Sequence, residues 1–292
     1  MVGQPVLPVS VMHSDQIDPA QLDGRPAVIF EQAVRQAKAD GVDLLVALPL
    51  FIGPSRALTE YLPKVFVESD PGAMKLSIRP ALFGDDGVEL LDLLVDNLKD
   101  TGWTKGAGTV LLCDHGSPIP EVTACRDQLA EALRQELGLT TTDLVACSME
   151  RRAGAEYAFN EPLLQDALAQ AKGDAVILML FLLPGRHAGP DGDVATIAKE
   201  HAPAGLRWKI SPLLGEHRYL PILLGLRLTS GPRPPASARR AMTLFLLALF
   251  LLALLFGVFL PSPWNGTLMA IGLALLIALP PLLLWTRRRR RN

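Results

Sequence analysis

Cysteine is scarce in this chain of 292 residues, which contains three cysteines and no Cys-x-x-Cys spacing. So few thiols exclude a disulfide-stapled secreted module, and their spacing offers no thiolate zinc site. The sequence also lacks a Walker loop, a Gly-x-Gly-x-x-Gly turn after a strand, a Gly-x-Ser-x-Gly elbow and a His-Glu-x-x-His pair. The absence of these motifs excludes the common nucleotide-binding proteins, serine hydrolases and zinc proteases.

Acidic residues are absent from the last 54 residues, Arg239 to Asn292, although this segment carries seven arginines. The rest of the chain carries 21 basic and 30 acidic side chains, an excess of negative charge that is unlike a nucleic-acid-binding protein. Hydrophobic residues make up 49% of the chain, which excludes a disordered protein. The arginines lie beside long apolar runs, and this combination is typical of a membrane segment.

Two apolar runs without a charge, residues 241–260 and 267–285, predict a helical hairpin that crosses a membrane. Each run is long enough to span the ~30 Å hydrocarbon core of a bilayer as a helix, and a short Pro- and Gly-containing turn separates them. Arginines precede the first run and follow the second, so we expect both chain termini on the cytoplasmic face of the inner or plasma membrane. The alternative is a buried hairpin in a soluble core, which would need a polar face that neither run has.

The residues before the hairpin alternate between strand-like and helix-like segments. The predicted strands are residues 6–12, 43–51, 75–82, 109–115, 143–149, 174–183 and 206–214. The predicted helices are residues 26–40, 57–68, 88–100, 119–137, 160–172, 191–202 and 216–227. Continuous apolar strands that alternate with helices predict an α/β fold with parallel sheets covered on both faces.

Two segments of the chain repeat one another. The helical sequence QAVRQAK (32–38) matches DALAQAK (166–172), and each leads into a strand that ends in a Phe- and Pro-containing turn. The second copy begins with a strand and a long helix, residues 109–137, that the first copy lacks, so we expect two related units of which the first is incomplete. The predicted domains are residues 1–105 (incomplete unit), 106–229 (complete unit), 230–240 (Pro-rich linker), 241–286 (transmembrane hairpin) and 287–292 (basic tail).

Two histidines follow predicted strands of the complete unit. His115 lies in the sequence DHGSP, after a strand and before a helix, and His187 lies in PGRHAGPD, after the strand 174–183. In open α/β sheets, the carboxyl ends of the strands form the crevice that binds ligands. Imidazole is a common metal ligand and titrates near neutral pH, so we expect the two side chains to converge on one metal ion or one proton. A single histidine is more often a packing or surface residue, but two at strand-end turns favour a site.

Taken in order, these motifs resemble those of a known family. DHGSP followed by a helix, then LFLLPGRHAGPDGDV (180–194) and LGEHRYLPILLGLR (214–227), are similar to the signatures of the class II tetrapyrrole chelatases. These are the sirohydrochlorin cobaltochelatases and ferrochelatases of the CbiX/SirB type. The resemblance covers residues 6–228, nearly all of the chain before the linker, and implies chelatase-like, flavodoxin-like parallel-sheet units.

The resemblance assigns roles to the two histidines. His115 and His187 match the family's paired active-site histidines, which hold the incoming metal and accept pyrrole protons as the metal enters the macrocycle. Insertion of a divalent ion into a tetrapyrrole releases two protons, so nearby bases assist the reaction. The resemblance implies that Co²⁺ or Fe²⁺ is a substrate, that the cleft lies between the two units, and that no organic cofactor takes part.

Three residues near the histidines are weaker candidates for contacts with the substrate. Ser117 follows His115 and is also suited to cap the next helix. Glu150 ends a strand and is either a third carboxylate near the metal path or a solvated acid at a helix start. Arg186 is suited to bind a carboxylate of the macrocycle, although Arg56 at the equivalent place in the first unit makes a role in the fold comparably plausible.

The sequence departs from the family pattern at two positions. Pro118 stands where the family usually has Arg after His-Gly-Ser, so a contact to substrate carboxylates is missing there. Ala57 stands at the histidine position of the first unit, so we expect that unit to supply walls of the cleft and no imidazole. Cys113 is expected to be a small buried strand residue.

The remaining polar candidates are expected to have structural or surface roles. Asp191 and Asp193 lie just before a predicted helix, and we expect them to cap it rather than to orient the neighbouring histidine. His13, His201 and His217 match no motif position that carries chemistry, and we expect them at the surface.

The sequence therefore favours an enzyme, a membrane-anchored chelatase that inserts Co²⁺ or Fe²⁺ into sirohydrochlorin or a related tetrapyrrole. The alternatives are a non-catalytic metal or tetrapyrrole carrier at the membrane and a structural membrane protein whose α/β body is a docking platform. The expected partners are the tetrapyrrole, the metal and the lipid bilayer, without nucleic acid. A second copy of the chain is a further expected partner, because the incomplete unit leaves a sheet position unpaired. Imidazole accepts several divalent metals, so the sequence does not choose between them.

Overall fold

A computed structural model of the protein describes residues 6–11, 17–22 and 24–229, which belong to one compact unit, residues 1–232. The predicted linker, hairpin and basic tail lie outside the described residues, as does His13. Within the described part of the chain, no helix is long and apolar enough to cross a membrane. The described residues form an α/β fold with two parallel sheets, as the alternation of segments predicts.

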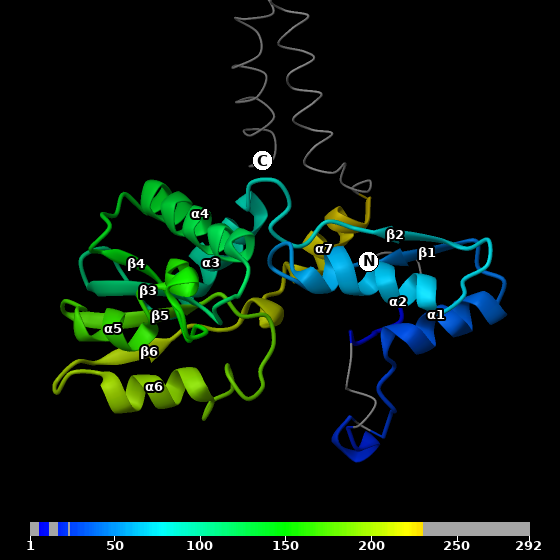
Figure 1. The fold of residues 1–292 in the computed structure, drawn as a ribbon. Helices are drawn as coiled ribbons and strands as arrows, with labels where there is room; N and C mark the ends of the chain where they lie inside the picture. Colours follow the sequence, from blue (N-terminus) through cyan, green and yellow to red (C-terminus); the bar gives the residue numbers. More distant parts are fainter. Residues whose placement is uncertain (1–5, 12–16, 23, 230–292) are drawn as a thin grey trace, which may run out of the picture. The chain divides into compact units, whose positions relative to one another are not determined.

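The larger sheet contains four parallel strands in the order β4-β3-β5-β6 (Figure 1). The strands are β3 (Gly108–Asp114), β4 (Leu144–Ser148), β5 (Asp174–Met179) and β6 (Trp208–Ile210). The helices packed on this sheet are α3 (Val88–Asp100), α4 (Pro120–Leu137), α5 (Leu164–Ala169) and α6 (Asp193–His201). Val110 and Leu112 of β3 lie in a core with α3 and α4, whereas Leu111 and Cys113 lie in a core with α5 and α6. Because alternate side chains enter opposite cores, both faces of the sheet are covered.

The smaller sheet pairs β1 (Leu44–Ala47) with β2 (Lys75–Ile78) in parallel. Helix α1 (Phe30–Ala39) precedes β1, and a π-helical turn, η3 (Ala57–Tyr61), leads into α2 (Leu62–Glu68). Apolar side chains of the two helices form the core of this sheet: Phe30, Val34, Leu62, Val65 and Phe66. Residue 57, which the family resemblance places at a histidine position, is therefore the first residue of η3.

Several strands are shorter than the sequence predicts, and prolines explain three of the shorter ends. Pro49, Pro80 and Pro212 each lie two residues beyond the last residue of a strand, β1, β2 and β6 respectively. Proline has no N–H to donate to a sheet and restricts the residue before it, so pairing stops ahead of it. The apolar runs that continue past these prolines are core-lining turns and not strand.

The predicted strand at residues 6–12 is wrong over the described residues 6–11. These residues make one isolated parallel bridge, between Ser10 and Ile29, and no ladder. In the larger sheet the corresponding strand, β4, pairs with β3 and also makes a parallel bridge, between Ser148 and Leu163. No described strand of the smaller sheet takes the place of β3, so residues 6–11 have no ladder to join.

The order of elements in the first part of the chain recurs in the second. Helix α1, strand β1, helix α2, strand β2 and helix α3 follow one another, as do α5, β5, α6, β6 and α7 (Leu220–Thr229). The bridging residues Ile29 and Leu163 each have extended backbone and directly precede the first helix of their series. This is the order that the sequence repeat requires, and superposition of the two series stays a prediction.

The last helix of each series contacts the other series. Leu90 and Leu94 of α3 lie in the core formed with β5 and α4. On α7, Arg227 donates hydrogen bonds to the carbonyl oxygens of Ala81 (3.2 Å) and Leu82 (2.8 Å) and pairs with Glu89 at 2.9 Å. The two series are thus tied together by contacts of their last helices, through leucines on α3 and a buried arginine on α7.

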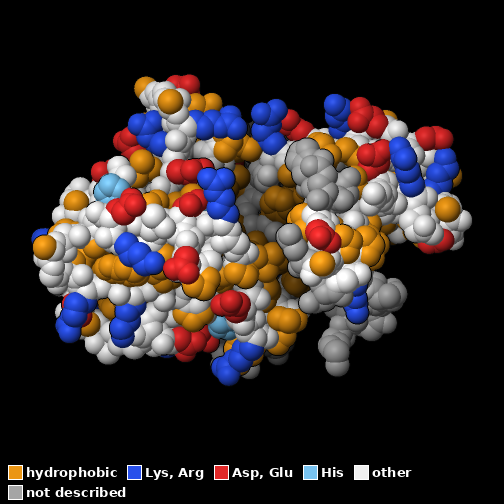
Figure 2. Space-filling model, turned by 90° about the horizontal axis from the view of Figure 1, so that it is seen from below, with side chains coloured by type: hydrophobic (Ala, Val, Ile, Leu, Met, Phe, Trp, Pro, Cys, Tyr) orange, Lys and Arg blue, Asp and Glu red, His pale blue; other side chains and the backbone are white. Residues whose placement is uncertain are grey.

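On the face shown in Figure 2, lysine and arginine side chains are interspersed with aspartate and glutamate. Hydrophobic side chains lie between them, and the basic side chains on this face do not merge into a continuous patch. The charge on the visible face is therefore mixed, in keeping with the excess of acidic residues before Arg239.

Replacing Arg227 with Met should lower the free energy of unfolding by about 3 kcal/mol, because it leaves two carbonyl groups and a carboxylate without their buried partner. Urea unfolding of the detergent-solubilised full chain, followed by tryptophan fluorescence, measures the loss. Arg207→Met is the matched control, since Arg207 also pairs with an acid, Asp174, but its side chain is 84% exposed. Exposed pairs contribute little, so the control should unfold almost as wild type does; equal losses in both variants would contradict the role given to Arg227.

Candidate active site

His115 lies immediately after β3, in a turn that only glycine permits. Gly116 has a φ of +91°, and a Cβ on it would lie 1.9 Å from the carbonyl oxygen of Glu150. The backbone N–H of Glu150 donates to the carbonyl oxygen of His115 at 3.2 Å. The close approach of these two chain segments, which follow β3 and β4, fixes where the imidazole of His115 leaves the sheet.

His187 lies in the loop between β5 and α6 and is held by the first turn of that helix. The backbone N–H of Val194 donates to the carbonyl oxygen of His187 at 3.1 Å, and that of Asp193 donates to Arg186 at 3.0 Å. Strand β5 runs beside β3, and the backbone N–H of Leu180 still donates to Cys113 at 2.8 Å where β5 ends. Both histidines therefore leave the same edge of the sheet from neighbouring strands.

The two imidazole rings lie against each other, with centroids 4.6 Å apart and planes at 77°. The Nδ1 atom of His115 is 3.0 Å from the carbonyl oxygen of Gly116, and that of His187 is 2.6 Å from Oδ2 of Asp193. A carbonyl or carboxylate oxygen only accepts, so each ring donates Nδ1–H and keeps a lone pair on Nε2. The side chains are 45% and 36% exposed, so both imidazoles can be reached from solvent, and Nε2 is the ring atom suited to bind a metal or accept a proton.

Two carboxylates stand next to the imidazoles. Oε1 of Glu150 lies 3.5 Å from Nε2 of His115, which places this acid at the site and not at a helix start. Asp193 accepts the proton of His187 on the opposite ring nitrogen. Among the described residues, no group of three or more His, Cys, Asp or Glu is arranged to hold a metal ion. The arrangement offers two imidazole donors and leaves the other coordination positions of a divalent ion to water or a further ligand.

The structure corrects the expected roles of both aspartates. The N-cap of α6 is Gly192, and no side chain caps this helix. Asp193 is the first residue of α6, and its carboxylate hydrogen-bonds His187. Asp191 is 93% exposed and pairs with Lys199 at 3.3 Å. The capping hypothesis is therefore wrong, and Asp193 has the orienting role that the sequence analysis disfavoured.

Ser117 and Arg186 lie beside the site without touching its reactive atoms. Ser117 does not cap α4, whose N-cap is Ile119; its Oγ instead accepts the N–H of Ile119 at 3.0 Å within the turn. Arg186 is 85% exposed and its Nε lies 3.7 Å from Oδ2 of Asp193. Its guanidinium group is open to solvent for an anionic group of a ligand.

The other histidines lie elsewhere. His201 is exposed at the end of α6, as expected. His217 is not a surface residue, because its side chain is 6% exposed; its Nδ1 accepts the N–H of Tyr219 at 3.2 Å and its Nε2 faces Asp96 at 3.9 Å. It folds inward because the short helix η5 (Leu214–Glu216) turns the chain back onto α3, a tertiary effect that no motif announces.

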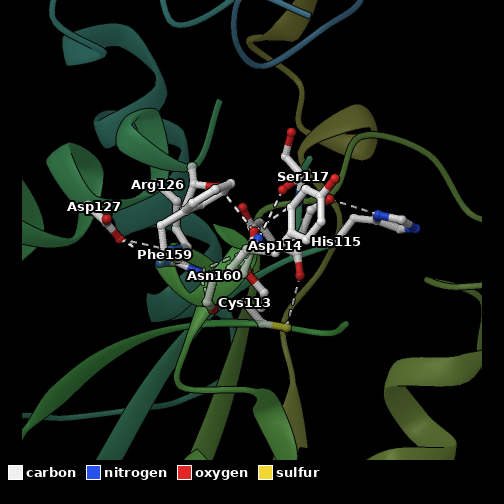
Figure 3. A network of polar contacts seen from close by, with 12 residues as sticks. Cys113, Asp114, His115, Ser117, Arg126, Asp127, Phe159 and Asn160 are labelled. Atoms are coloured by element: carbon white, nitrogen blue, oxygen red, sulfur yellow. Dashed lines mark hydrogen bonds and ion pairs between the residues drawn. The ribbon is translucent and has the colours of Figure 1, made fainter. Parts of the chain in front are cut away.

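A buried polar network holds the turn that carries His115, and sequence reasoning missed it (Figure 3). Arg126 on α4 donates to Oγ of Ser148 (2.6 Å) and to the carbonyl oxygen of Asn160 (3.1 Å). Ser148 in turn donates to Oδ1 of Asp114 at 2.6 Å. The Asn160 amide accepts the N–H of Ser117 and donates to its carbonyl oxygen, both at 2.9 Å. The residues on either side of His115 and Gly116 are thereby fixed by side chains from α4, β4 and the segment before α5.

Asp114, the last residue of β3, is the acid of this network. Burial raises the pKa of Asp114 above its usual value, while the charge of Arg126 and hydrogen bonds from Ser148 and the N–H of Gly116 act in the opposite direction. The Arg126 side chain is 2% exposed, with Nη1 3.6 Å from Oδ1 of Asp114. A signal was present in the sequence, because Arg126 lies three and seven residues before Leu129 and Leu133 on the apolar stripe of α4.

Cys113 is a buried strand residue, as predicted. It is fully buried on β3 and pairs in register with Cys147 on β4. The hydrogen bond with Cys147 and burial raise the pKa of Cys113 well above its usual range, so the group stays a neutral thiol. Cys113 therefore packs beneath the site and supplies no thiolate to it.

The comparisons with known proteins agree with this fold. Residues 109–230 match the model of the CbiX family. No curated protein sequence matches the chain. The fold is similar to that of SirB from Bacillus subtilis with Fe3+, at 16% identity and a TM-score of 0.52, over 75% of this chain and 92% of that one. It is also similar to the sirohydrochlorin chelatase SirB from Bacillus subtilis subspecies spizizenii in complex with cobalt, at 14% identity and a TM-score of 0.50, over 78% and 95% of the two chains. The family match spans both histidines, and the similarity to the two solved structures shows a shared fold.

Replacing Arg126 with Met should destabilise the protein by about 3–5 kcal/mol at neutral pH, because Asp114 is left as a buried charge without its cation. Its pKa, already raised, rises further, so the folded state binds the proton more tightly than the unfolded state. The stability linked to this group is present below the unfolded pKa and is lost as pH rises through the folded pKa. The deficit against wild type should therefore shrink between about pH 7 and about pH 5.

Urea midpoints of wild type and variant across this pH range measure the effect. The double variant Arg126→Met with Asp114→Asn is the control, because it lacks the buried carboxyl group. The remaining acid partner of Arg126, Asp127, is 54% exposed, so the deficit of the double variant should change little with pH. A deficit in the single variant that is constant with pH would show that Asp114 is not the partner of Arg126.

Proposed function

We propose that this protein inserts a divalent metal, Co²⁺ or Fe²⁺, into sirohydrochlorin or a related tetrapyrrole. The observation that carries the proposal is the pair of imidazole rings of His115 and His187, 4.6 Å apart, each partly exposed and with Nδ1 held by an acceptor. The family match covers both residues. Two structurally similar proteins are described with Fe3+ and with cobalt, which supports a transition metal as the cargo.

In the proposed reaction, the Nε2 atoms of His115 and His187 bind the metal ion and present it to the macrocycle. As the divalent ion binds the four nitrogen atoms of the macrocycle, the two pyrrole N–H bonds break and balance its charge, so the site has to accept two protons. Once the metal has left Nε2 of His115, that atom and the carboxylate of Glu150, 3.5 Å away, are suited to take one proton each. The carboxylate of Asp193 stabilises positive charge on His187, whether that charge comes from a metal or a proton.

The proposed substrate carries acidic side chains around its rim. Arg186 is next to His187 and 85% exposed, so its guanidinium group is placed to bind one such carboxylate. Ser117 contributes through the position of the turn, since its Oγ already accepts a backbone N–H. No organic cofactor is part of the proposal.

A carrier that binds metal or tetrapyrrole without turnover is the second candidate. It is favoured by Pro118, which stands where the family usually has Arg after His-Gly-Ser, and by Ala57 in η3, which leaves the first unit without a histidine at that position. Binding of the tetrapyrrole without a rate above the spontaneous reaction would support the carrier.

We further propose that residues 241–286 anchor the protein as a transmembrane hairpin with both chain termini in the cytoplasm. The proposal rests on the sequence, which has two long uncharged runs flanked by arginines on their outer ends. The substrate would then meet the site at the cytoplasmic face of the membrane. A second copy that pairs with the short β1–β2 sheet also remains part of the proposal.

Replacing His115 or His187 with Ala should lower the rate of Co²⁺ or Fe²⁺ insertion by about 100-fold or more, because each removes a metal donor and proton acceptor. The absorbance change of the tetrapyrrole on metal insertion measures the rate with the purified full chain. His201→Ala is the matched control, since His201 is exposed at the end of α6. Full activity in both site variants would reject the imidazole mechanism.

Replacing Asp193 with Asn should weaken Co²⁺ binding about tenfold or more, because the amide supports His187 less well than a carboxylate does. Titration with Co²⁺ followed by its visible absorption measures the affinity. Asp191→Asn removes the same charge two residues away, where the side chain is 93% exposed, and should leave the affinity unchanged. If the two variants behave alike, general charge near the loop and not the hydrogen bond to His187 is responsible.

The anchor predicts which side of the membrane each part of the hairpin faces. In intact cells, a membrane-impermeant maleimide should label Cys in the variant Trp264→Cys, whose site lies in the turn, and not in Asn292→Cys. The native cysteines are buried and form the background measured with the unchanged protein. Labelling of Asn292→Cys from outside would overturn the proposed topology.

A further inference from the structure

Helix α7 buries its charged residue and exposes apolar residues, which is unusual for a helix on a protein surface. Its ten residues include one charged side chain, Arg227, and that side chain is turned inward and 5% exposed. Ile222 faces outward and is 59% exposed, and Leu226 is 46% exposed. In an ordinary amphipathic surface helix, the charged residues face water and the apolar residues face the core.

The outward apolar residues share one face of the helix. Ile222 and Leu226 are four residues apart on α7, which places them one above the other on the helix surface, and Tyr219 lies in the turn directly before the helix. Tyr219 is 44% exposed, and the guanidinium carbon of exposed Arg218 lies 4.8 Å from the centre of its ring. An apolar stripe that starts with an arginine and a tyrosine is the pattern of a segment at a membrane–water interface.

The buried contacts on the inward face of α7 hold the helix in this orientation. Leu220 and Leu223 are buried in the core that also contains α3 and α4. Arg227 donates hydrogen bonds to two carbonyl groups and pairs with Glu89. The helix is therefore fixed in rotation by its buried contacts, and the face with Ile222 is held outward.

The chain that follows α7 leads directly to the proposed membrane anchor. The helix ends at Thr229, and the eleven residues 230–240 separate it from the apolar run 241–260. At most ~3.6 Å for each residue, eleven residues reach about 40 Å. If the run 241–260 enters a bilayer, the C-terminal end of α7 has to stay within that distance of the bilayer surface.

We propose that the outward face of α7, formed by Ile222 and Leu226 and preceded by Tyr219, rests on the lipid surface of the cytoplasmic leaflet, with Arg218 bound to lipid phosphate. The inference rests on the proposed transmembrane hairpin and extends it, because it assigns the bilayer a second contact, made by the α/β body itself. Contiguous exposed apolar residues next to a cation are suited to the boundary between headgroups and acyl chains. The contact would set the orientation of the α/β body against the membrane.

The test uses the full chain in vesicles of equal parts phosphatidylglycerol and phosphatidylcholine. A fluorophore sensitive to its surroundings is attached to the single new cysteine of Ile222→Cys, and nitroxide-labelled lipid is then added. The three native cysteines are at most 4% exposed, so labelling of the new site dominates. The emission should shift to the blue and be quenched at least twofold by the nitroxide lipid.

Two further variants serve as controls for this measurement. Val67→Cys places the same probe on an exposed residue of α2, 71% exposed, where neither a shift nor quenching is expected. Leu251→Cys places it in the middle of the run 241–260, where quenching reports insertion of the hairpin. Metal insertion, measured on the same samples, reports the enzyme separately.

Quenching at 222 and 251, but not at 67, supports the proposal. Quenching at 251 alone overturns it and leaves the anchor standing, whether the probe at 222 sits in water or is blue-shifted by a protein contact with the hairpin or a second copy. The absence of quenching at 251 overturns both the hairpin and the lipid contact. None of these outcomes depends on whether the chain inserts metal.

Discussion

Strands β3 and β5 run side by side in parallel, paired from Gly108 with Asp174 to Cys113 with Met179. The pairing begins where a side chain is impossible, because a Cβ on Gly108 would lie 1.9 Å from the carbonyl oxygen of Asp174. Both strands end at one edge of the sheet, and each is followed within a few residues by a histidine. A shift of this pairing by one residue would turn the side chains of one strand to the opposite face of the sheet. It would also move one imidazole by about 3.3 Å. The ring-to-ring contact of His115 and His187 is thus a consequence of register.

Register alone does not fix a side chain on a turn, and the protein uses charge for that purpose. The imidazoles are partly exposed, whereas the groups that hold their supports are buried: Arg126 is 2% exposed and Asn160 is fully buried. Buried charges are costly unless each donor and acceptor is satisfied, and here the guanidinium group meets a hydroxyl, carbonyl oxygens and acids. The imidazoles are therefore accessible to solvent, and the buried residues that support them are held rigidly. This arrangement is suited to a ligand that enters and leaves.

The order of the elements and the convergence of His115 and His187 were predictable from the sequence, because both depend on local patterns. Apolar strands alternate with helices, and His115 and His187 each follow a strand, so parallel pairing brings them to one edge. The strand ends were less accurate, since apolar runs continue beyond Pro49 and Pro80 although pairing cannot.

The supports of the site were not predictable to the same degree, because they depend on how distant segments meet. Asp193 stands where a helix cap is common, and the closing of its own loop turns it toward a histidine. His217 carries no motif and is folded inward by α3. The buried position of Arg126 could have been predicted from the sequence, because a charged residue on the apolar stripe of a helix needs buried partners.

The contacts that α3 and α7 make with the other series have a consequence for how the protein can be divided. Cut at residue 105, the first fragment would carry the leucines of α3 without the sheet that buries them, and the second would carry the Arg227 side chain without the carbonyl groups that it binds. Neither piece is a self-sufficient folding unit, although the sequence reads as two copies of a pattern. A gene that encoded one copy would have to make a dimer whose subunits supply these contacts to each other, and joining two such copies in one chain makes the contacts intramolecular and independent of concentration.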